Sequence, residues 1–209
     1  NAAFEKYAAK YDIPFDSLNG DAFSDDMKAQ TIEAIKNTMP GKKLDMIVYS
    51  VAAPKRTDPH TGEVYSSVLK PIGNPYSEKS VDFHTGKVSS VSIDPATDDE
   101  IAATVKVMGG EDWLMWINAL KENDLIAENA VTLAYSYIGP ELTHAVYKDG
   151  TIGRAKIDLE EKAREIDKLL SDIGGKAYIS VNKALVTQSS AAIPVAVSYT
   201  HLTLPTIYS

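Results

Sequence analysis

Three short apolar segments that alternate with helical patterns constrain the fold most strongly. They lie at 44–49 (LDMIVY), 130–136 (AVTLAYS) and 176–181 (KAYISV), and each has the length of a strand. The first is apolar almost throughout, which is typical of a strand buried on both faces in a parallel sheet. Strands that alternate with helices at these lengths favour a parallel sheet with helical crossovers. The sequence therefore predicts an α/β fold.

Capping residues set the bounds of the helices between these strands. Ser24 is a plausible N-cap for a helix that ends near 39–41 (MPG). Residues 97–100 (TDDE) form a capping box, and their helix ends at 109–110 (GG). A long helix ends at 174–175 (GG), and its apolar face consists of Leu159, Ala163, Ile166, Leu169, Leu170 and Ile173. Further elements are expected at 2–10 (helix), 15–18 (short strand), 112–120 (helix, with Trp113 and Trp116 in the core) and 183–192 (helix).

Composition excludes several classes of protein. The 209 residues are 44% hydrophobic and 24% charged, which is ordinary for a globular chain. The 21 basic and 29 acidic residues give a net charge of −8 without a basic block, so we expect no nucleic-acid partner. The absence of cysteine excludes a disulfide scaffold and thiolate metal sites, and it fits a reducing cytoplasm. No apolar run is long enough to span a membrane.

Residues 54–95 differ in character from the rest of the chain. They are rich in Pro, Gly, Ser, Thr and β-branched residues, and they contain candidate hairpin strands at 64–70 and 80–93. A surface excursion explains this composition. An insertion after a sheet strand is also where a cover over a substrate often lies.

Most residues that could carry chemistry are scattered. No pair of the 4 histidines has ligand spacing, and neither a nucleophile elbow nor a Walker loop occurs. The informative stretch is 135–156, which holds three tyrosines and ends in Lys156, directly after a buried strand. Tyr147 and Lys156 are separated by eight residues. In a chain with 11 tyrosines and many lysines this spacing alone is weak, so the surrounding sequence must decide.

Five blocks of the sequence resemble the trans-2-enoyl-CoA and enoyl-ACP reductases of the FabV/TER type. They are VYSVAAPKRTDPHTGEVYSSVLKPIG (48–73), IAATVKVMGGEDW (101–113), AYSYIGPE (134–141), YKDGTIGRAK (147–156) and SVNKALVTQSSAAIP (180–194). The resemblance extends over essentially 1–195. It implies a divergent short-chain dehydrogenase/reductase with a Rossmann-like, doubly wound parallel sheet that binds NADH. Such an enzyme reduces the C2=C3 double bond of a trans-2-enoyl thioester in fatty acid biosynthesis.

The resemblance also implies roles for individual residues. Tyr147 would be the proton donor, and Lys156 would hold the cofactor ribose and lower the pKa of Tyr147. Tyr137 would bind the substrate, although a strand-end core residue is the alternative for this position. The cofactor contacts would come from Asp21, Ala22, Val51, Ala52, Lys156, Leu185, Val186 and Thr187, with Asp21 and Ala22 at the adenine. Many family members have Leu where Val51 stands, and ordinary short-chain dehydrogenases have a Tyr-x3-Lys spacing instead of Tyr-x8-Lys.

The sequence also departs from the family. The family's glycine-rich phosphate loop has no counterpart in 1–209, so NADH, as opposed to NADPH, is implied by the resemblance alone. Residues 197–209 resemble a translated sequencing adapter, as seen at the ends of fragmentary metagenomic genes. We therefore expect a partial reductase domain at 1–196, truncated at both ends, followed by a non-native tail. A chain limited to these 209 residues is expected to bind NADH weakly and to consume little of it with enoyl-CoA.

Other expectations and alternatives complete the prediction. The family implies a cytoplasmic monomer that acts on enoyl-CoA or enoyl-acyl carrier protein, and the chain does not indicate which carrier is used. One alternative is a short-chain dehydrogenase that acts on an alcohol or ketone. The other is a non-catalytic Rossmann-like binding module, in which Tyr147 and Lys156 need not converge.

Overall fold

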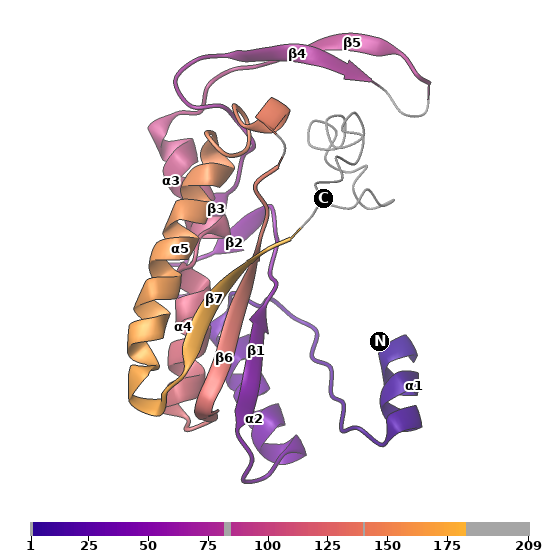
Figure 1. Ribbon diagram of the computed structural model, residues 1–209, viewed down its shortest axis with the longest axis vertical. Coiled ribbons are helices and arrows are strands. Elements are labelled where there is room, and N and C mark those ends of the chain that lie inside the picture. The colour runs from indigo at the N-terminus through magenta and orange to yellow at the C-terminus, as the bar shows by residue number, and fades with distance from the viewer. Residues whose placement is uncertain (1, 82–84, 140, 183–209) are drawn as a thin grey trace, which may run out of the picture.

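The computed structural model describes residues 2–81, 85–139 and 141–182. Its core is a three-stranded parallel sheet in the order β1-β6-β7 with helices packed against it (Figure 1). The elements are α1 (Ala2–Tyr11), α2 (Asp25–Thr38), β1 (Leu44–Tyr49), β2 (Lys55–Thr57), β3 (Val64–Ser66), β4 (Tyr76–Val81), β5 (Val88–Ile93), α3 (Asp98–Met108), α4 (Glu111–Glu122), β6 (Ile126–Ser136), η1 (Glu141–Thr143), α5 (Thr151–Leu169), η2 (Ser171–Ile173) and β7 (Lys176–Val181). The predicted α/β class with a parallel sheet is confirmed.

The strand register brings the carboxyl ends of all three strands to one edge of the sheet. Tyr49 of β1 pairs with Ala134 of β6, and Ser136 of β6 pairs with Val181 of β7. Because the strands are parallel, the residues that follow each of them emerge at this same edge. In open α/β sheets, this is where ligands bind.

The core lies between one face of the sheet and the helices α4 and α5. The Trp113 and Ile117 side chains on α4 are fully buried, and the predicted apolar face of α5 packs on the sheet through Leu159 and Ile166. The capping residues also behave as predicted. Ser24 caps α2, and Thr97 forms the complete capping box of α3.

The prediction that β1 is buried on both faces is wrong. Met46 is 58% exposed and Val48 is 46% exposed. In the described part of the chain β1 is an edge strand, and the helices α4 and α5 cover only the opposite face. The short strand expected at 15–18 is also wrong, because the exposed residues 13–19 have no regular secondary structure and pair with no described strand.

Residues 54–95 form two antiparallel hairpins, as their composition suggests. The expected strand at 64–70 is the shorter β3, which pairs with β2 at 55–57, a strand that was not expected. The expected strands at 80–93 correspond to β4 and β5, which pair from Tyr76–Ile93 to Val81–Val88. Figure 1 shows β4–β5 beyond the carboxyl ends of the parallel strands. The Ala96 amide donates to the Pro71 carbonyl at 2.9 Å, so the chain closes on itself at the base of this hairpin.

Two predictions concern residues that the structure does not describe. The helix expected at 183–192 and the tail expected at 197–209 both fall in the range 183–209, outside the described residues. The division at residue 196 therefore stays a prediction. Among the described helices, none is long and apolar enough to cross a membrane.

Candidate active site

The candidate site lies at the carboxyl edge of the parallel sheet. Tyr137 directly follows β6, and Val51 and Ala52 follow β1 by two and three residues. Tyr147 comes from the segment between η1 and α5, and Lys156 lies in the second turn of α5. The chain must therefore turn back sharply between Tyr147 and Lys156 to bring both side chains to the same edge.

Backbone hydrogen bonds produce this turn. The Tyr147 amide donates to the Thr143 carbonyl at 2.8 Å, and the Gly153 amide donates to the Tyr147 carbonyl at 2.8 Å. The second bond ties Tyr147 directly to the first turn of α5. The eight-residue spacing between Tyr147 and Lys156 thus spans a tight turn followed by the beginning of a helix.

Thr151, the first residue of α5, anchors the helix to a distant segment. Its buried hydroxyl donates to the Val68 carbonyl at 2.5 Å, and its amide donates to the Lys70 carbonyl at 3.0 Å. The Lys70 amide donates back to the Thr151 hydroxyl at 3.3 Å. The end of α5 that carries the site is therefore fixed by a polar cluster that satisfies its own donors and acceptors.

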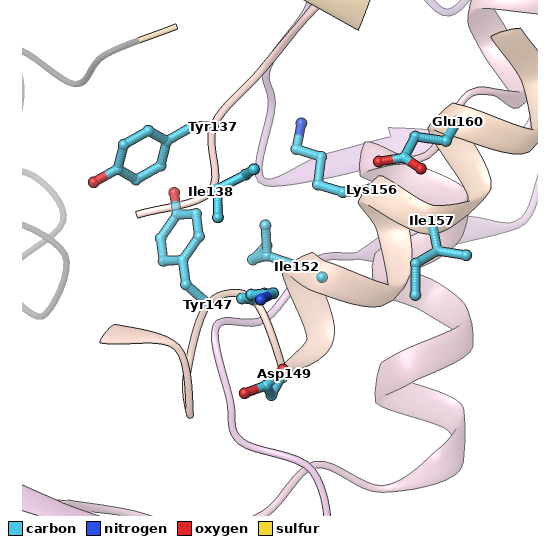
Figure 2. Close-up of a pocket in the computed structure, with 10 residues that line it drawn as sticks. Tyr137, Ile138, Tyr147, Asp149, Ile152, Lys156, Ile157 and Glu160 are labelled. Atoms are coloured by element: carbon cyan, nitrogen blue, oxygen red, sulfur yellow. The ribbon is translucent and has the colours of Figure 1, made fainter. Parts of the chain in front are cut away.

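Tyr137, Tyr147 and Lys156 line one cavity of about 270 Å³ (Figure 2). The Tyr137 and Tyr147 rings meet edge to face, with centroids 5.2 Å apart and an interplanar angle of 85°. Figure 2 shows the Tyr147 hydroxyl pointing toward Tyr137. The other lining residues are Ile138, Lys148, Asp149, Ile152, Gly153, Ile157 and Glu160.

Burial dominates the titration of the two central groups. It raises the pKa of Tyr147, with a smaller contribution from Tyr137, and it lowers the pKa of Lys156. The resemblance implied a lowered pKa for Tyr147, and the structure has the opposite direction. The physical reason is that partial burial disfavours the phenolate. Near neutral pH the Tyr147 hydroxyl therefore keeps its proton and can act as a donor.

This arrangement can stabilise a developing negative charge on oxygen. A tyrosine hydroxyl held by its backbone and by a neighbouring ring is a preorganised hydrogen-bond donor. The isoleucines at 138, 152 and 157 line the cavity, and of these Ile152 is buried while Ile138 and Ile157 are about half exposed. The Lys156 ammonium can bind hydroxyl oxygens or balance negative charge.

The other predicted cofactor residues do not line this cavity. Asp21 and Ala22 lie in the turn before α2, where the Asp21 carboxylate accepts the Phe23 amide at 3.0 Å. Val51 is half-buried and Ala52 is exposed, at the same sheet edge as Tyr137. The residues Leu185, Val186 and Thr187 lie outside the described residues.

Sequence reasoning missed Thr151 and Gly153. Both fall inside the block YKDGTIGRAK, and Gly150-Thr151 could have been recognised as a helix start. The contacts of Thr151 with Val68 and Lys70 join segments far apart in the chain, so no local pattern indicates them. In the described residues, no cluster of three or more His, Cys, Asp or Glu side chains could hold a metal ion.

Comparison with known proteins shows the family to which this chain belongs. Residues 1–207 match the family described as the trans-2-enoyl-CoA reductase catalytic region. The chain belongs to the trans-2-enoyl-CoA reductase family. It is 58% identical over 195 residues to the trans-2-enoyl-CoA reductase [NADH] of Ruminiclostridium cellulolyticum, covering 93% of this chain and 49% of that protein.

Two further relatives agree with the family. The enoyl-[acyl-carrier-protein] reductase [NADH] of Flavobacterium johnsoniae is 57% identical over 202 residues, which are 97% of this chain and 50% of that protein. The crystal structure of Treponema denticola trans-2-enoyl-CoA reductase in complex with NAD matches with a TM-score of 0.86 and 51% identity, over 93% of this chain and 48% of that one. This member of the reductase family thus spans about half the length of the relatives it matches.

Proposed function

We propose that the protein is an NADH-dependent reductase of trans-2-enoyl thioesters, with enoyl-CoA or enoyl-acyl carrier protein as substrate. One observation carries the proposal. Tyr147, Tyr137 and Lys156 line a single cavity at the carboxyl edge of the parallel sheet. The names of the relatives, which specify NADH and both kinds of thioester, support the same activity.

In this proposal, Tyr147 donates a hydrogen bond to the thioester oxygen and then gives its proton for delivery to C2, and the tyrosinate takes up a replacement proton from water. Hydride addition at C3 of a conjugated enoyl thioester moves negative charge onto the thioester oxygen, and a proton then completes the saturated product at C2. A preorganised donor at that oxygen lowers the barrier by a few kcal/mol, on the order of 2.7–4 for one oxyanion-hole donor. The raised pKa of Tyr147 keeps this donor protonated. Tyr137 holds the Tyr147 ring and contacts the acyl thioester.

The residues present fit part of a dinucleotide. Lys156 lines the same cavity as Tyr147, and Figure 2 shows its ammonium apart from the Tyr147 hydroxyl, where it suits the hydroxyls of a ribose. The Asp21–Ala22 turn would contact the adenine, and Val51 and Ala52 would contact the cofactor after β1. Leu185, Val186 and Thr187 would do so after β7. When bound, NADH would supply the hydride for C3.

The two alternatives have less support. A non-catalytic binding module does not require Tyr147 and Lys156 to converge, yet both line one cavity. A short-chain dehydrogenase acting on an alcohol or ketone does not account for the hairpin β4–β5 beyond the sheet edge, where it could cover a long acyl thioester (Figure 1). We keep the monomeric state and the cytoplasmic location as predictions, to be checked by size-exclusion chromatography and by cell fractionation.

The proposed function is tested by adding trans-2-butenoyl-CoA and NADH to the purified full-length protein, which here means a gene product as long as the relatives that this chain matches. We expect NADH absorbance to fall and butanoyl-CoA to form in equal amounts. Butanoyl-CoA, which lacks the double bond, is the control and should consume no NADH. Oxidation of alcohols with NAD, without reduction of trans-2-butenoyl-CoA, would contradict the proposal and favour the dehydrogenase.

The pH profile tests the role of Lys156. Burial lowers the pKa of Lys156 and raises that of Tyr147, so it moves the loss of the Lys156 cation to lower pH and the loss of the Tyr147 proton to higher pH. We propose that the alkaline fall in kcat/KM reports loss of the Lys156 cation. Arginine stays charged at all accessible pH values, so in Lys156→Arg we expect this fall to move to higher pH.

A matched variant separates this effect from a general effect of the substitution. Lys168→Arg changes an exposed lysine near the end of the same helix, and its alkaline limb should coincide with that of the unmodified protein. If the alkaline limbs of Lys156→Arg and of the unmodified protein coincide, Lys156 does not control this limb.

A further inference from the structure

Two side chains from neighbouring helices donate hydrogen bonds to the turn that contains Asp21 and Ala22. The Trp116 indole on α4 donates through Nε1 to the Ala22 carbonyl at 3.1 Å. The Lys28 ammonium on α2 donates to the Phe23 carbonyl at 2.8 Å. Successive backbone carbonyls of one turn are thus fixed by donors from two helices.

The Lys28 ammonium is itself buried and balanced by a buried carboxylate. Lys28 is 4% exposed, and its Nζ lies 2.8 Å from Oδ1 of Asp112, which is 2% exposed. The Lys28 ammonium also lies 5.3 Å from the centre of the Trp116 ring. The two donors that hold the turn are therefore packed against each other.

Asp112 extends this network to the end of β1. Its second oxygen, Oδ2, accepts the Tyr49 hydroxyl at 3.1 Å. Tyr49 is the last residue of β1, and one residue separates it from the Val51–Ala52 pair. One buried carboxylate thus joins two of the described segments for which cofactor contacts are proposed, the Asp21–Ala22 turn and the end of β1.

A buried ion pair is a poor source of stability, because desolvation offsets most of the Coulomb attraction. The position of the ion pair explains its presence better. The Lys28 ammonium donates to the Phe23 carbonyl beside the Asp21–Ala22 turn, and the Asp112 carboxylate accepts the Tyr49 hydroxyl at the end of β1. We infer that Trp116, Lys28 and Asp112 are positioning residues for the adenine half of the dinucleotide, which they serve by holding the Asp21–Ala22 turn in place. The inference rests on the proposed function.

Trp116→Phe is the sharpest test, because it keeps an aromatic ring beside Lys28 and removes the donor to the Ala22 carbonyl together with part of the indole ring. In the full-length protein we expect the dissociation constant for NADH to rise about fivefold, the value of one lost hydrogen bond. The dissociation constant for reduced nicotinamide mononucleotide, which lacks the adenine, should stay unchanged. Both constants are measured by the fluorescence of the reduced nicotinamide.

Trp113→Phe is the matched control. It also removes an indole donor from α4, but that donor bonds to Thr132 in the core, at 2.9 Å. We expect it to lower the unfolding temperature without changing the ratio of the two dissociation constants. A general loosening of α4 would instead change this ratio equally in Trp113→Phe and Trp116→Phe, which would overturn the inference.

A second variant tests the charge pair. Lys28→Met alone leaves a buried carboxylate uncompensated and could prevent folding, so the double variant Lys28→Met/Asp112→Leu removes both charges together. We expect it to fold and to lose NADH affinity by more than the fivefold change of Trp116→Phe, again with unchanged affinity for the mononucleotide.

The outcomes separate the inference from the proposed function. Unchanged NADH affinity in Trp116→Phe and in the double variant overturns the inference and leaves the function intact. An unmodified protein that binds NADH but does not reduce enoyl thioesters overturns the function alone. An unmodified full-length protein that does not bind NADH overturns both.

Discussion

Tyr147→Phe is expected to lower kcat about 10²- to 10³-fold, while the dissociation constant for NADH changes by no more than about twofold. The substitution removes the hydroxyl proposed to donate to the thioester oxygen. It keeps the ring, whose edge-to-face contact with Tyr137 at 5.2 Å should persist. The loss should therefore fall on turnover and leave binding nearly intact. Steady-state rates with trans-2-butenoyl-CoA and an NADH titration measure the two quantities.

Tyr135→Phe is the matched control for this experiment. Tyr135 is 48% exposed and lies two residues before Tyr137 on β6, but it does not line the cavity. Loss of its hydroxyl should leave kcat unchanged. Unaltered turnover in Tyr147→Phe would remove Tyr147 from the proposed role.

Gly153→Ala is expected to destabilise the protein by about 1–3 kcal/mol and to lower turnover at least about tenfold. A Cβ at this position would lie 1.7 Å from the Lys148 carbonyl oxygen and 3.1 Å from the Tyr147 carbonyl oxygen. Both are backbone atoms, so the first turn of α5 would have to move away from Tyr147. The shift would also break the hydrogen bond from the Gly153 amide to the Tyr147 carbonyl.

The test of this prediction is whether Gly153→Ala lowers or raises the free energy of unfolding. Helix propensity alone favours alanine over glycine by roughly 0.8–1 kcal/mol, so without the clash the variant would be more stable. Urea unfolding of the unmodified protein and of Gly153→Ala measures the difference. Arg154→Ala, at an exposed position on the same turn, is the control and should be close to neutral. A stabilised, fully active Gly153→Ala would contradict the described geometry of the turn.

The sheet could be predicted because its signals are local. Each of the three strands contains the predicted apolar run, although β6 begins at Ile126, four residues earlier than predicted, and the caps at Ser24 and Thr97 need only residues within one helical turn. The exposure of Met46 could not be predicted in this way. Whether a strand face is buried depends on which elements pack against it, and the strand's own sequence does not contain that information.

The candidate site was less accessible to local reasoning. The spacing of Tyr147 and Lys156 is weak by itself, and it became a prediction only through the resemblance of the surrounding blocks. The structure adds the reason that the two residues line one cavity. Thr151 fixes the start of α5 to Val68 and Lys70, and Gly153 lets the turn close on Tyr147. The direction of the Tyr147 pKa shift was mispredicted, because it depends on burial that only the packed cavity reveals.

The hydrogen bond between Ala96 and Pro71 has a consequence for how this chain can evolve. It closes residues 72–95 into a loop whose two ends meet, while Lys70 on one side is tied to α5. Changes of length within such a loop alter its closure entropy only slightly, by about 0.6 kcal/mol for a doubling. The excursion can therefore diversify, or be exchanged for that of a relative, while the sheet and α5 keep their arrangement. The hairpin β4–β5 can in this way change independently of the residues that line the candidate site.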